Sequence, residues 1–201
     1  MQPVRVISGT GVPLDRSDVD TDQIIPASWL KRVERTGFGV GLFSAWRESD
    51  PDFPLNRPEF SGASILVAGP NFGVGSSREH AVWALTDHGF KAVISPRFGD
   101  IFRSNATKTG LVPVVVPGEF ASALMRKIEA DPATVIMIDV AEGWVSVPGT
   151  GLETDFPLDD FTRYRLVEGL DDIGLSLRHV DKIAEYETRR PSWMPWVVQT
   201  S

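Results

Sequence analysis

Short apolar runs alternate with amphipathic stretches through the middle of the chain. The runs are rich in valine and isoleucine, as buried strands are, and they occupy residues 63–69, 91–96 and 111–116. Apolar positions at helical spacing predict helices at residues 77–88, 100–109 and 119–130. Gly89 and Gly110 are natural ends for the first two helices, and Pro113 places the third strand at a sheet edge or a bulge. This alternation predicts an α/β fold with parallel strand pairing.

The flanking segments add antiparallel and irregular structure. Residues 4–15 predict a strand followed by a turn, and residues 134–141 and 144–149 predict a hairpin joined near Glu142 and Gly143. Two further helices are expected at residues 158–169 and 179–190. Residues 31–58 are rich in Gly, Pro, Arg and aromatics without a clear period, which predicts a long loop with a short helix. The expected sheet is therefore mixed.

Length and composition narrow the class of protein. The chain has 201 residues, which suggests one domain with room for a terminal extension. Its formal net charge is −7 and its basic residues do not cluster, which argues against nucleic-acid binding. The first ten residues resemble no signal peptide and no apolar run is long enough to span a membrane, so we expect a cytoplasmic protein. It has no cysteine, which excludes disulfides, thiolate metal sites and an iron–sulfur cluster held by this chain alone.

The stretch GPNFGVGSSREHAVW, residues 69–83, carries the candidate chemistry. It follows a predicted strand and opens a predicted helix, the context in which glycine-rich turns bind ligands. Gly73 and Gly75 allow positive φ or close approach of the backbone to a ligand. Ser76 and Glu79 fit a capping box, so a purely structural helix cap is the alternative.

Arg78 favours a binding role for this turn. In the first turn of a helix, a cation opposes the helix dipole, whereas an anionic ligand there is stabilised. The turn lacks the final glycine of a dinucleotide fingerprint and the lysine of a P-loop. A guanidinium binds carboxylates in bidentate fashion, and a small carboxylate substrate therefore fits better than a nucleotide.

Two motifs resemble those of one family. Residues 69–81, GPNFGVGSSREHA, are similar to the active-site turn of the swivelling domain in the aconitase superfamily, and residues 18–27, DVDTDQIIPA, resemble its D-T-D-x-I-I-P motif. Their order, spacing and flanks resemble the stand-alone small subunits of bacterial 3-isopropylmalate dehydratase over nearly the whole chain. One difference is Val74, where many relatives carry cysteine.

The resemblance implies a fold and a partner. The expected fold is an aconitase-type swivelling domain, with a barrel-like mixed parallel and antiparallel sheet flanked by helices. Residues 1–157 would form this domain, with a substrate loop at 29–41, and residues 158–201 a C-terminal helical extension packed on it. The family's large subunit holds a [4Fe–4S] cluster on three cysteines, and the small subunit lies over it as a lid in a heterodimer. This chain would thus bind no cofactor or metal itself.

The resemblance also implies a reaction, the interconversion of 2-isopropylmalate and 3-isopropylmalate through 2-isopropylmaleate in leucine biosynthesis. By similarity, Ser76 is the base that removes the carbon-bound proton, acting as an alkoxide. Ser77 and Arg78 would bind a substrate carboxylate, and Asp22 would orient Arg78 or the substrate. The alternative for Asp22 is a turn or cap carboxylate. A calcium loop starting at Asp18 lacks the required glycine and glutamate.

The loop at residues 29–41 resembles the family's substrate-recognition loop. Leu30 or Val33 is a candidate to contact the isopropyl group, and Arg32 or Arg35 to bind a carboxylate; the alternative is a solvated basic turn. This loop should distinguish the enzyme from its siblings, the small subunits of homoaconitase and of methylmalate or citraconate dehydratase. A non-enzymatic module that binds anions or nucleotides is the alternative from another class.

Overall fold

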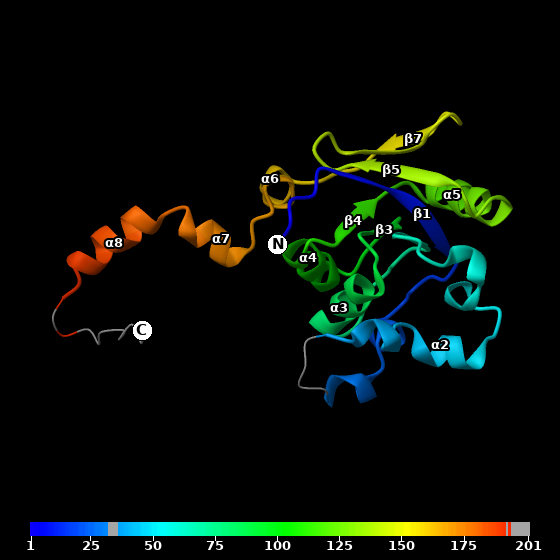
Figure 1. The fold of residues 1–201 in the computed structure, drawn as a ribbon, viewed down its shortest axis with the longest axis horizontal. Coiled ribbons are helices and arrows are strands. Elements are labelled where there is room, and N and C mark those ends of the chain that lie inside the picture. Colours follow the sequence, from blue (N-terminus) through cyan, green and yellow to red (C-terminus); the bar gives the residue numbers. More distant parts are fainter. Residues whose placement is uncertain (32–35, 192, 194–201) are drawn as a thin grey trace.

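The computed structural model describes residues 1–31, 36–191 and 193, and a seven-stranded sheet lies at the centre of this part of the chain (Figure 1). The strand order is β4-β3-β2-β1-β5-β6-β7. The first four strands are parallel: β1 Val6–Leu14, β2 Ile65–Ala68, β3 Ala92–Ser95 and β4 Val112–Val115. The other three continue the sheet in antiparallel fashion: β5 Val135–Asp139, β6 Trp144–Val147 and β7 Leu152–Asp155. The predicted mixed sheet is confirmed.

Strand β1 joins the two halves of the sheet. Its first part pairs with β5, from Val6 opposite Asp139 to Thr10 opposite Val135. Its second part, from Gly11 onward, pairs with β2. Exposed and buried residues are mixed in the first part, whereas the last four residues are all buried, as expected of a parallel strand covered on both faces.

Three helices accompany the parallel strands: α3 Glu79–His88, α4 Asp100–Thr109 and α5 Gly118–Ala130. Helices α3 and α4 contact each other, and α4 also contacts β4. Helix α5 contacts β1, β2 and β3 and also β7, at the far end of the strand order, so the sheet curls around this helix as a half-barrel. The predicted barrel-like mixed sheet flanked by helices is thereby confirmed, and β4 lies at the sheet edge as Pro113 indicates.

The described residues of the long loop predicted at 31–58, and the segment just before it, form several short helices. They are α1 Thr21–Ile24, η1 Ala27–Lys31, η2 Phe38–Gly41, α2 Ser44–Ser49, η3 Pro54–Asn56 and η4 Pro58–Phe60. Phe38, Phe43, Phe53 and Phe60 are buried in the core. These aromatic anchors give the region a fixed course that hydrophobic periodicity does not reveal, because they lie singly in, or just before, short helices and form no repeat.

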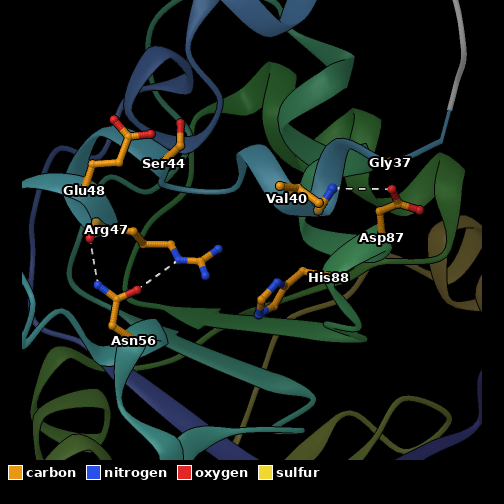
Figure 2. A pocket seen from close by; sticks show the side chains of 9 residues that line it. Gly37, Val40, Ser44, Arg47, Glu48, Asn56, Asp87 and His88 are labelled. Carbon is orange, nitrogen blue, oxygen red and sulfur yellow. Dashed lines mark hydrogen bonds between the residues drawn. The ribbon is translucent and has the colours of Figure 1, made fainter.

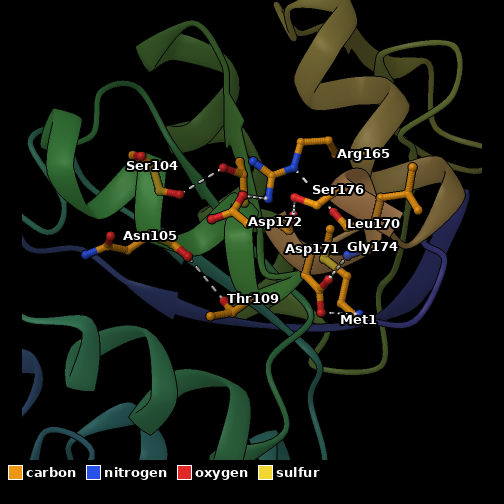
Figure 3. Close-up of polar contacts among 11 residues, drawn as sticks. Met1, Ser104, Asn105, Thr109, Arg165, Leu170, Asp171, Asp172, Gly174 and Ser176 are labelled. Carbon is orange, nitrogen blue, oxygen red and sulfur yellow. Dashed lines mark hydrogen bonds and ion pairs between the residues drawn. The ribbon is translucent and has the colours of Figure 1, made fainter. Parts of the chain in front are cut away.

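The C-terminal helices leave the sheet. Helix α6, Asp160–Glu168, stays close to it, with Leu166 buried, whereas α7, Asp172–Leu177, and α8, Val180–Thr188, extend away (Figure 1). Polar contacts hold the start of α7: Arg165 pairs with Asp172 at 2.9 Å, and the amino group of Met1 lies 3.6 Å from Asp171 (Figure 3). The domain division at residue 157 stays a prediction. No helix within the described ranges is long and apolar enough to cross a membrane.

Candidate functional site

The two sequence motifs meet in space. The turn between β2 and α3 runs alongside the segment that leads into α1: the Gly73 N–H donates to the Val19 carbonyl at 2.8 Å, and the Thr21 N–H to the Val74 carbonyl at 3.0 Å. The Thr21 hydroxyl, buried with 2% exposure, donates to the Ser76 carbonyl at 3.1 Å. These bonds fix the backbone on both sides of the candidate site.

The glycines of the turn have separate reasons to lack a side chain. Gly73 has φ of +74°, and a Cβ there would lie 2.3 Å from the Phe102 ring, which packs underneath. Gly75 has φ of +89° and faces more open space, so its requirement is conformational. The positive φ values turn the chain between β2 and α3 and leave Ser76 and Ser77 exposed.

Helix α3 begins two residues later than predicted. Its first residue is Glu79, and Arg78 is the N-cap residue, in an extended conformation and without a side-chain cap bond. The alternative that Ser76 and Glu79 form a capping box is therefore wrong. The physical reason is a tertiary contact. The Thr21 hydroxyl donates to the Ser76 carbonyl and holds Ser76 in the turn before the helix, too early to cap it.

The charge of Arg78 is balanced by a carboxylate from the other motif. Its guanidinium forms an ion pair with Asp22 and lies 3.5 Å from the Ile25 carbonyl, so α1 and the residue that ends it supply both partners. The Arg78 side chain is 16% exposed and that of Asp22 is 53% exposed. The expected contact between Asp22 and Arg78 is present, and the misplaced cation at the start of α3 is balanced by this carboxylate. Their roles toward a substrate stay predictions.

The serine hydroxyls face solvent. Neither Ser76 nor Ser77 has a side-chain hydrogen bond to any described residue, so both hydroxyls are free to meet a ligand beside Arg78. Leu30 is half-buried in η1, on the predicted substrate loop. The other loop candidates, Arg32, Val33 and Arg35, lie outside the described residues.

His80 has a packing role. Its ring contacts Phe38 at 5.3 Å and Trp83 at 4.7 Å between ring centroids, which ties α3 to η2.

Sequence reasoning missed Thr21, whose hydroxyl and backbone both hold the turn. A signal was present, since Asp20 and Gln23 form the capping box of α1 and so predict its start. Within the described part of the chain, no group of three or more His, Asp or Glu side chains is arranged to hold a metal ion. Without cysteine, the residues present do not fit an iron–sulfur cluster.

Comparisons with known proteins point to one family. Residues 1–119 match the family model of the aconitase C-terminal domain, and residues 172–200 match that of the C-terminal domain of 3-isopropylmalate dehydratase small subunits. The 3-isopropylmalate dehydratase small subunit of Parafrankia sp. is 60% identical over 195 residues, covering 97% of this chain and 98% of the relative. The small subunit of Frankia alni is 59% identical over 198 residues, covering 98% of this chain and 100% of the relative.

A solved structure supports the same assignment. The crystal structure of 3-isopropylmalate dehydratase from Methanocaldococcus jannaschii superposes with a TM-score of 0.66 at 26% identity, covering 90% of this chain and 99% of that one. Fold, motif geometry and sequence similarity agree over almost the whole length. The chain therefore belongs to the family of 3-isopropylmalate dehydratase small subunits.

Proposed function

We propose that this chain is the small subunit of a cytoplasmic heterodimer that interconverts 2-isopropylmalate and 3-isopropylmalate through 2-isopropylmaleate in leucine biosynthesis. The observation that carries the proposal is the junction of the two motifs. There, two exposed serines directly precede Arg78 in the chain, and the Arg78 guanidinium is held by Asp22. A site of this kind binds a carboxylate and presents a hydroxyl next to it.

In the proposed reaction, Arg78 and Ser77 bind one carboxylate of the substrate. Ser76, as the alkoxide, takes the proton from the carbon next to the one that bears the hydroxyl in 2-isopropylmalate. The electron pair of that C–H bond forms the double bond, and the hydroxyl departs from the neighbouring carbon. Return of the proton to the other carbon, with water added the other way round, gives 3-isopropylmalate. The large subunit's proposed [4Fe–4S] cluster would supply the Lewis acid for the hydroxyl.

Stabilising the Ser76 alkoxide is the main task of this chain. A free serine is a poor base, so its anion needs positive charge and N–H donors nearby. Arg78, two residues further along, supplies the charge. Asp22 and the Ile25 carbonyl keep its guanidinium in place. The buried Thr21 holds the backbone of Ser76 itself, so the base and its electrostatic partner are both positioned by α1 and the residue that ends it.

The test uses the assembled enzyme. This chain is co-expressed with a cluster-bearing large subunit, and hydration and dehydration of 2-isopropylmaleate and 2-isopropylmalate are assayed anaerobically. We expect activity from the complex and none from this chain alone. Ser76→Ala should keep subunit association and lower kcat by several orders of magnitude. The matched control is Ser104→Ala, an exposed serine on α4 away from the turn.

Two outcomes would contradict the proposal. Near-normal turnover by the Ser76→Ala complex would remove Ser76 from the mechanism. An active complex that prefers homologous substrates, such as methylmalate or homocitrate, over 2-isopropylmalate would keep the chemistry and reassign the substrate.

A further inference from the structure

A second polar cleft lies at the opposite end of α3 from Ser76. It has a volume of about 840 Å³, within the range of small-molecule sites. Its walls come from η2, α2, η3 and the last turn of α3 (Figure 2). The lining residues are mostly polar: Gly37, Gly39, Val40, Ser44, Arg47, Glu48, Asn56, Asp87 and His88.

Arg47 is fixed in this cleft and forms no ion pair with an acidic side chain among the described residues. Its Nε donates to the Asn56 side-chain oxygen at 3.2 Å, and Asn56 in turn donates to the Arg47 carbonyl at 2.8 Å. The rest of the guanidinium makes no ion pair with any residue that the structure describes. Figure 2 shows it pointing across the cleft toward the His88 ring. A half-buried, pre-oriented fork of N–H donors is suited to a carboxylate.

The other charged groups around the cleft favour a monoanion. The Asp87 carboxylate accepts the Gly39 N–H at 3.3 Å, and the Glu48 carboxylate points away from the guanidinium (Figure 2). Partial burial of the ring lowers the pKa of His88 and the charge of Arg47 lowers it further, against a backbone hydrogen bond with Gly39 that raises it, so the ring adds no second positive charge to the cleft at pH 7. One permanent positive charge near two carboxylates suits a singly charged ligand better than phosphate.

We propose that this cleft binds a small organic carboxylate as a monoanion, with Arg47 as the bidentate anchor and the neutral His88 ring as the opposite wall. The ligand would lie against η2, at the end of the predicted substrate loop. Gly39 packs on α3 so closely that a Cβ there would be 2.8 Å from the His88 backbone nitrogen. An occupant of the cleft therefore contacts the base of that loop. The site involves neither Ser76 nor Arg78, so it stands independently of the proposed function.

The experiment is an NMR titration of the full chain, labelled with ¹⁵N, at constant ionic strength. Sodium acetate is the carboxylate probe and inorganic phosphate is the comparison. We expect saturable acetate shifts at the amides of Gly39, Asp87 and His88, and weaker binding of phosphate. Arg47→Gln should weaken acetate binding about tenfold or more, as expected for losing a charge-assisted bidentate contact. Arg126→Gln, at an exposed position on α5, is the matched control and should leave it unchanged.

Non-saturable shifts, an equal affinity in Arg47→Gln, or tighter binding of phosphate than of acetate would each overturn the proposal. If Arg47→Gln proves unfolded in its thermal melt, Arg47→Lys takes its place, because lysine keeps the charge but loses the planar fork of N–H donors. That variant should bind acetate several-fold more weakly than the parent chain. An unchanged affinity in Arg47→Lys would then overturn the assignment.

Discussion

Replacing Thr21 by valine tests how the two motifs are held together. Valine keeps the shape of threonine but removes the hydroxyl that donates to the Ser76 carbonyl at 3.1 Å. A hydrogen bond of this kind contributes about 0.5–1.5 kcal/mol net, and a buried carbonyl left unpaired costs more. Ser76 is exposed, so water can reach its carbonyl, and we expect a loss of about 1 kcal/mol. For a chain of this size that lowers Tm by about 2–4 °C.

The assay is thermal unfolding of the isolated chain followed by circular dichroism. Thr107→Val is the matched control, because the Thr107 hydroxyl bonds only within α4, to the Ser104 carbonyl. In the assembled enzyme, Thr21→Val should also lower kcat more than it changes KM, since the position of Ser76 is relaxed. A melting temperature equal to that of the control would refute the reasoning that this bond fixes the turn.

Two further predictions concern a glycine and a histidine. Gly73→Ala should destabilise the protein in urea unfolding by about 2–4 kcal/mol, from the positive φ plus displacement of Phe102. Gly149→Ala, with φ of +75° and open space around it, should cost only about 1 kcal/mol, and equal losses would refute the packing argument. By NMR, His88 should titrate below the ordinary pKa of 6.5, so its contribution to stability is present above pH 6.5 and is lost as the pH falls through the folded value. Arg47→Gln should raise that pKa, and an unchanged value would show that Arg47 does not act on the ring.

The regular helices and strands could be predicted from the sequence where the burial of their residues follows a regular pattern. The strand predicted at residues 91–96 is β3, and the helix at residues 100–109 is α4 with the same ends. Strand β7 was missed because its residues alternate between exposed and half-buried without an apolar run. Helix α7 was missed because its six residues form too short a repeat to show a period, and Ile173 and Leu177 are exposed.

The site was predictable in its parts and not in its assembly. The residues around Ser76 could be singled out locally, because Arg78 conflicts with the helix dipole. Their junction with Asp22 depends on contacts between segments more than fifty residues apart, and periodicity carries no information on such contacts. The resemblance to a family supplied that link. The start of α3 was predicted two residues too early for the same reason, since the hydroxyl of Thr21, distant in sequence, donates to the Ser76 carbonyl.

The shared strand β1 has a consequence for synthesis of the protein. Its second part can pair with β2 as soon as residue 68 has left the ribosome, but its first part must wait for β5, near residue 135. During that interval the Val6–Thr10 backbone is an open sheet edge, the kind of surface on which nascent chains join one another. Aggregation of this protein should therefore depend on how quickly the ribosome translates residues 69–139, between the end of β2 and the end of β5.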